Sequence, residues 1–124
     1  MTKKVSVLVV EDDESMLEYV STVLERLGFE VTQASTGREV IAALAVKEFD
    51  IVMTDHLTVD YKGTSVLAAV KMLRPTAEVI VMSGIPTLEE AAASYLKGAR
   101  AYLAKPFGLD QLRSAVMRCL EGTA

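Results

Sequence analysis

The pattern that decides the fold begins at residues 5–14, which read VSVLVVEDDE. A short run of mostly β-branched residues, typical of a buried strand, ends abruptly in four acidic residues. The apolar residues that follow recur at spacings of three and four as far as Gly28, which predicts an amphipathic helix that ends at that glycine. A strand followed by a helix is therefore the first structural unit of the chain.

The same unit recurs along the rest of the sequence. Apolar runs followed by helical spacing predict strands at residues 29–34, 49–54, 78–82 and 99–104. Capping boxes are expected at Thr36–Glu39 and Thr87–Glu90, and Arg74-Pro75 should close the third helix. The strands are apolar on both faces, so we predict a parallel sheet covered by helices on both sides. With right-handed crossovers the fold class is α/β, a flavodoxin-like doubly wound (βα)5 with strand order 2-1-3-4-5.

The composition is that of a globular protein with a real core. Of 124 residues, 51% are hydrophobic and 24% charged, and the formal net charge is −4. This length predicts one domain, residues 1–124 with a core at about 5–121, and the composition excludes disorder and coiled coil. The single Cys119 excludes a disulfide framework. The acidic balance argues against nucleic-acid binding, and with no membrane span or secretory leader we expect a cytoplasmic protein.

Chemically active side chains are expected at the carboxyl end of this sheet, where ligands of such folds bind. The residues that end the strands there are Glu11, Asp12, Asp55, Ser83 and Lys105. Three carboxylates at one edge repel one another unless a cation is present, and oxygen-only ligands suit Mg²⁺ or another divalent ion such as Mn²⁺. With an ammonium and a hydroxyl added, these are the parts needed to accept a phosphoryl group on a carboxylate.

Five motifs in order resemble the receiver domain of two-component response regulators. They are VLVVEDD at residues 7–13, DIVMTD at 50–55, Gly63, VMSG at 81–84, and KGA at 97–99 followed by YLAKPF at 102–107. The resemblance runs from Val5 to about Leu120. It implies a response regulator receiver domain that takes a phosphoryl group from the phosphohistidine of a sensor histidine kinase or phosphotransfer protein. Such a domain promotes its own Mg-dependent phosphorylation and dephosphorylation and is not a turnover enzyme on external substrates.

The resemblance also implies which residues hold the metal and the phosphoryl group. Asp55 is expected to be the phosphoacceptor and a metal ligand. Asp12 is expected to bind Mg²⁺ directly, Glu11 mainly through water, and Leu57 through its backbone carbonyl. Asp13 is interpreted as a first-turn residue of the following helix, where an acidic side chain is favoured.

A second group of residues is implied to respond to the phosphoryl group. Ser83 and Lys105 would hold its oxygens, Ser83 and Tyr102 would form the switch, and the bond before Pro106 would be cis. The surface of the helix after Thr87, strand 99–104 and the final helix would then change its partners. Those partners are a downstream protein, a fused output domain or a second copy of the chain; this domain itself binds neither nucleic acid nor membrane. His56, a lone loop histidine, is expected to be solvated.

The sequence departs from the family in one loop, where Thr58 and Val59 stand in place of the usual apolar residue and proline.

Two alternative functions are also open. A receiver-like module could bind proteins without phosphorylation, although the intact acidic set argues against it. A flavodoxin-like cofactor protein would need phosphate donors in its first loop, where Glu11–Glu14 would repel a phosphate.

Overall fold

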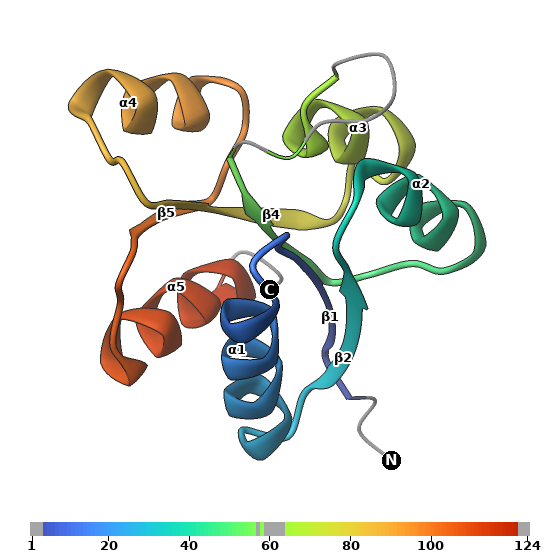
Figure 1. Cartoon of the computed structure of the whole chain (residues 1–124). Helices are drawn as coiled ribbons and strands as arrows, with labels where there is room; N and C mark the ends of the chain where they lie inside the picture. The colour runs from blue at the N-terminus through green and yellow to red at the C-terminus, as the bar shows by residue number, and fades with distance from the viewer. Residues whose placement is uncertain (1–3, 57, 59–63, 122–124) are drawn as a thin grey trace.

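The computed structural model describes residues 4–56, 58 and 64–121, in which strands and helices alternate (Figure 1). The strands are β1 (Ser6–Val10), β2 (Glu30–Ala34), β3 (Ile51–Asp55), β4 (Glu78–Ser83) and β5 (Ala101–Ala104). The helices are α1 (Glu14–Arg26), α2 (Gly37–Val46), α3 (Val66–Leu73), α4 (Leu88–Leu96) and α5 (Leu109–Glu121). All paired strands are parallel, in the order β2-β1-β3-β4-β5. The predicted fold class and strand order are therefore confirmed.

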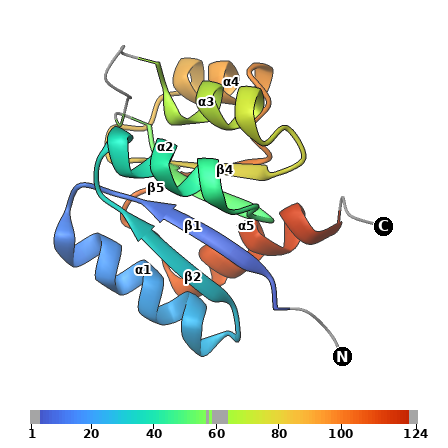
Figure 2. The same ribbon diagram turned by 90° about the vertical axis from the view of Figure 1, so that its right-hand side faces the viewer.

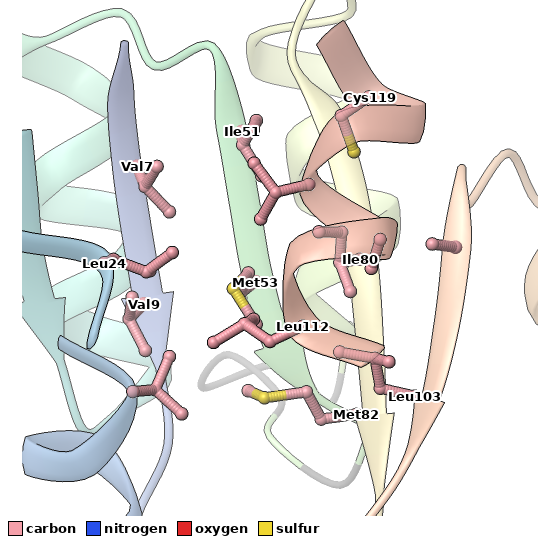
Figure 3. Close-up of a cluster of buried hydrophobic side chains, with 14 of the residues drawn as sticks. Val7, Val9, Leu24, Ile51, Met53, Ile80, Met82, Leu103, Leu112 and Cys119 are labelled. Atoms are coloured by element: carbon pink, nitrogen blue, oxygen red, sulfur yellow. The ribbon is translucent and has the colours of Figure 1, made fainter. Parts of the chain in front are cut away.

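The sheet separates two hydrophobic cores. Helices α1 and α5 cover one face, and α2, α3 and α4 lie over the other (Figures 1 and 2). Successive strand residues point to opposite faces, so Val9 and Met53 belong to the first core while Leu8 and Val52 belong to the second. Figure 3 shows the first core, where Leu112 and other side chains of α5 pack against the strands. Because both faces are covered, β1, β3 and β4 are buried and mostly apolar, as the sequence predicts. The edge strand β2 departs from this expectation, since Glu30, Thr32 and Gln33 leave it only partly buried.

Polar side chains cap the first turns of α1 and α2. Asp13 accepts a hydrogen bond from the backbone N–H of Met16 at 3.1 Å, so it is the N-cap of α1. The prediction that Asp13 lies in the first turn of this helix is therefore wrong by one position. Thr36 and Glu39 form the predicted reciprocal capping box of α2. These caps satisfy backbone donors that the first turn of a helix leaves without partners.

Helix α4 departs from the prediction at its start. Thr87 accepts from the N–H of Glu90 at 3.0 Å, but the Glu90 carboxylate turns toward the carboxyl edge of the sheet, so the expected capping box is only half formed. Within Leu88–Leu96, Ser94 alone is buried. Leu88 and Leu96 are 90% and 89% exposed, so α4 has little apolar anchorage.

The end of α4 explains why β5 begins at Ala101 and not at residue 99. Gly98 has φ 105°, a left-handed conformation that glycine adopts without a steric penalty. The N–H of Ala99 then bonds back to the carbonyl of Ser94 at 2.9 Å, which closes the helix before the strand can start. None of the helices within the described ranges is long and apolar enough to cross a membrane.

Candidate functional site

The predicted acidic residues come together at the carboxyl edge of the sheet. Val10 of β1 pairs with Thr54 of β3, so the residues that follow them, Glu11 and Asp55, lie side by side at the carboxyl edge. Glu11, Asp12 and Asp55 each offer a carboxylate oxygen within 4.8 Å of the other two. Glu11 and Asp55 are buried and Asp12 is exposed.

This donor set fits a hard divalent cation. All three groups supply carboxylate oxygens, and the exposed Asp12 leaves one side open to water, which Mg²⁺ retains when it binds to proteins. The predicted fourth ligand, Leu57, lies outside the described residues, as do Val59 and Gly63. The residues present in the structure are therefore compatible with the metal that the sequence predicted.

Lys105 reaches the acidic residues from the end of β5. Its ammonium pairs with the buried carboxylate of Glu11, whose other oxygen accepts from the N–H of Asp13 at 3.1 Å. Burial raises the pKa of Glu11, and the bonds from Lys105 and Asp13 offset this only in part. The Lys105 N–H continues the β4–β5 ladder to the carbonyl of Ser83 at 2.7 Å, and the Lys105–Pro106 peptide bond is cis.

Ser83 and Tyr102, the two residues expected to form a switch, share a partner that we had not foreseen. Ser83 is fully buried at the end of β4, and its hydroxyl accepts from the N–H of Ile85 at 3.2 Å. The half-buried Tyr102 donates its hydroxyl to the carboxylate of Glu90 on α4. Burial and this carboxylate raise the pKa of Tyr102, so its hydroxyl remains a donor. The Ser83 side chain lies close enough to Glu90 to lower the pKa of that carboxylate.

His56 belongs to the same arrangement, and the expectation that it is solvated is wrong. Its Nε2 lies 3.1 Å from Oε2 of Glu90, and its Nδ1 lies 3.6 Å from Oδ1 of Asp55. Burial would raise the pKa of Glu90, but hydrogen bonds from Ser83 and Tyr102 and the charge of His56 outweigh it and hold this pKa below its usual value. We call Glu90 and its partners Ser83, Tyr102 and His56 the Glu90 cluster.

The amino-acid sequence did not assign His56 or Glu90 to the site, for different reasons. His56 directly follows a strand-end acid, so its place at the edge could have been predicted from the strand alone. Glu90 carried the wrong signal, since its spacing from Thr87 is that of a capping box. A cavity of about 160 Å³ lies beside these residues, and its lining includes Asp55, His56 and Glu90.

The doubly wound fold and the acidic residues at the carboxyl edge of its sheet define a class of protein, the receiver domains of two-component signalling. Residues 7–117 match the family model of the response regulator receiver domain, and the chain belongs to this family. It is 34% identical over 114 residues to the DNA-binding transcriptional regulator NtrC of Salmonella typhimurium, covering 92% of this chain and 24% of the relative. The chain spans about a quarter of the length of the curated relatives it matches.

Solved structures agree with this membership. A CheY-like receiver domain protein from Methanospirillum hungatei superimposes with a TM-score of 0.87 at 30% identity, over 97% of this chain and 96% of that one. A response regulator from Burkholderia pseudomallei with a phosphorylated aspartic acid, a calcium ion and citrate is similar at a TM-score of 0.80 and 26% identity, over 96% of this chain and 71% of that one.

Proposed function

We propose that this receiver accepts a phosphoryl group on Asp55 from the phosphohistidine of a sensor histidine kinase or a phosphotransfer protein. The observation that carries the proposal is the convergence of Glu11, Asp12 and Asp55 with the Lys105 ammonium at one edge of the sheet. In the transfer, an oxygen of the Asp55 carboxylate bonds to phosphorus while the P–N bond of the donor breaks. The electron pair of that bond stays on the histidine nitrogen.

The remaining groups at this edge would hold the metal and the phosphoryl oxygens. Asp12 and Asp55 would bind Mg²⁺ directly, Glu11 through water, and the Leu57 carbonyl would complete the set as in the family. Bound there, the cation offsets charge on the transferring oxygens. The Lys105 ammonium, which pairs with Glu11, would exchange that carboxylate for a phosphoryl oxygen. Ser83, buried at the end of β4, would donate its hydroxyl to the phosphoryl group.

Phosphorylation would act on partners through α4, β5 and α5. A phosphoryl group adds a charge of about −1.5 to −2 beside Ser83, which is coupled to α4 and β5 through Glu90 and Tyr102. We propose that the affected surface controls a downstream protein, a fused output domain or a second copy of the chain. The similarity to transcriptional regulators several times longer supports a fused output. We further propose that residues 5–121 act as one receiver unit, supported by the family match over residues 7–117.

The test is phosphorylation by a small donor. Acetyl phosphate should add one phosphoryl group to the wild-type protein only when Mg²⁺ is present, with release of acetate, because the acidic edge cannot take an anion without a cation. Intact-mass spectrometry measures the product, and peptide mapping should place it on Asp55. Asp55→Asn should abolish labelling, whereas Asp110→Asn, an exposed acid on α5, should not.

Two results would contradict the assignment. Labelling of Asp55→Asn to the wild-type level would show that another residue is the acceptor. Labelling that EDTA does not reduce would show that the acidic residues need no cation. Partner binding by a protein that is never labelled would favour the phosphorylation-independent module instead.

A further inference from the structure

Helix α4 is attached to the sheet mainly by polar contacts. No side chain within Leu88–Leu96 belongs to the core on that face of the sheet, and Ser94 is the one buried residue of the helix. Glu90, on its first turn, points inward and contacts His56, which directly follows β3, and Tyr102 of β5. Glu90 therefore links the first turn of α4 to groups beside the phosphorylation site.

The partners of Glu90 are the groups next to the acceptor. Its Oε1 accepts from the hydroxyl of Tyr102, and its Oε2 lies 3.1 Å from Nε2 of His56. The Ser83 side chain is near enough to lower the pKa of the same carboxylate. The other ring nitrogen of His56 is 3.6 Å from the Asp55 carboxylate. Asp55, His56 and Glu90 also line the same cavity. Glu90 is thus a fourth acid at the site, separated from the acceptor by one imidazole.

We propose that Glu90 is a positioning residue, which holds the Tyr102 hydroxyl and the His56 imidazole beside Ser83 while Asp55 carries no phosphoryl group, and from which phosphorylation must free these groups. This inference rests on the proposed function of Asp55. Glu90 thereby opposes phosphoryl binding and sets how easily the site switches.

Three physical effects act in the same direction. Ser83, which lies near Glu90, has a single hydroxyl proton, so donating it to the phosphoryl group leaves none for Glu90. The phosphoryl group brings negative charge into a cavity wall that already contains the Glu90 carboxylate, and like charges repel. His56, held by Glu90, is less available to the new anion. Removing the Glu90 charge should therefore strengthen phosphoryl binding.

The test uses beryllofluoride as the phosphoryl analogue, titrated with Mg²⁺ into the whole chain and followed by NMR. Glu90→Gln keeps the size of the side chain and removes its charge. Its apparent Kd for beryllofluoride should fall by about tenfold, which corresponds to about 1.4 kcal/mol. The matched control is Glu89→Gln, which removes the same charge from the same turn at an exposed position and should change the Kd by no more than about twofold.

A positioning role also predicts a change in the protein before beryllofluoride is added. The amide signals of Ser83 and Tyr102 should shift in Glu90→Gln and stay in place in Glu89→Gln. If the Kd falls without those shifts, the effect is one of charge alone and the positioning role is wrong. If Glu90→Gln fails to fold, Tyr102→Phe, which removes one bond to Glu90, should still move the Ser83 amide and lower the Kd by about threefold; no change there would overturn the proposal.

The wild-type titration separates this inference from the function on which it rests. A wild-type protein that binds no beryllofluoride and is not labelled at Asp55 overturns the proposed function and the role of Glu90 with it. A wild-type protein that binds the analogue, with Glu90→Gln equal to Glu89→Gln, overturns the role of Glu90 alone.

Discussion

Three consecutive acids at the end of β1 have three different environments. Glu11 is buried and pairs with Lys105, Asp12 is exposed at the edge beside Asp55, and Asp13 turns back to cap α1. The side chains separate because the chain leaves an extended strand and enters a helix within these residues. The three side chains are chemically similar, but the direction of the backbone at each position gives each one a different role.

This separation predicts opposite outcomes for two alanine variants. Asp13→Ala removes an N-cap and should lower the free energy of unfolding by about 1 kcal/mol, within a range of about 0.5–2, while Mg²⁺ affinity stays near that of the wild type. Asp12→Ala should leave stability nearly unchanged and weaken Mg²⁺ binding by at least about tenfold. Urea unfolding and calorimetric titration measure the two quantities. A larger loss of Mg²⁺ affinity in Asp13→Ala than in Asp12→Ala would show that the metal ligands are misassigned by one residue.

At the scale of elements, the helices differ in what holds them to the sheet. Helix α1 buries Val20 and Leu24 against the first core, and α5 buries Leu112 and Val116 there. Helix α4 has no comparable apolar anchor and depends on the Glu90 cluster. An element with few buried apolar contacts opens at a lower free energy than its neighbours.

Hydrogen exchange should reveal this difference. Backbone amides of Leu88–Leu96 should exchange at least about tenfold faster than those in the centre of α1 and α5, since less apolar surface must be exposed to open α4. Native-state exchange followed by NMR or mass spectrometry gives the rates. Equal protection of the three helices would show that α4 is held by more than its polar contacts.

The capping box of α2 predicts a pH dependence of stability. Backbone and side-chain hydrogen bonds from Ser35 lower the pKa of Glu39 below its ordinary value of 4.5. A carboxylate whose pKa is depressed by folding stabilises the folded state above that ordinary value, and its contribution disappears as the pH falls through the depressed pKa. The difference in unfolding free energy between wild type and Glu39→Gln should therefore shrink on acidification below about 4.5. Denaturant titrations at neutral and acidic pH measure it, and a difference that is constant with pH would contradict the capping role.

At the scale of the whole molecule, one sheet supports both cores and the site. Strands β1 and β3 lie at its centre, where crossover connections leave in opposite directions and open a crevice at the carboxyl ends. The cores fix these strands from both faces, so Asp55 and Glu11 are held by buried structure on either side. Cys119 lies in the first of these cores, where burial raises its pKa to about 12.

Core packing should therefore control stability without altering the chemistry at the edge. Leu112→Ala, at a side chain with no exposed surface, should lower the free energy of unfolding by about 2–5 kcal/mol. The matched control is Leu109→Ala on the same helix, where 43% of the residue is exposed and the loss should stay below about 1 kcal/mol. Both folded variants should still be labelled at Asp55 by acetyl phosphate. Equal destabilisation by the two variants would show that α5 packs differently.

The order of the elements, the order of the strands and the edge that carries the site could be predicted from the amino-acid sequence. These follow from local patterns, because apolar periodicity defines each strand and helix and handedness then restricts the topology. Glu11, Asp12 and Asp55 could be placed at one edge because each lies at the end of a strand or within two residues of it. The same reasoning placed Ser83 and Lys105 at that edge.

Which of these groups contact one another depends on how distant elements pack together. Lys105 pairs with Glu11 across 94 positions of sequence, and the direction of the Glu90 side chain depends on where α4 lies over β5. From the local sequence alone, Thr87 and Glu90 are expected to form a capping box. His56 has no neighbour in sequence that would bury it. Their actual partners come from β4, β5 and α4, and contacts between distant elements leave no periodic signal in the chain.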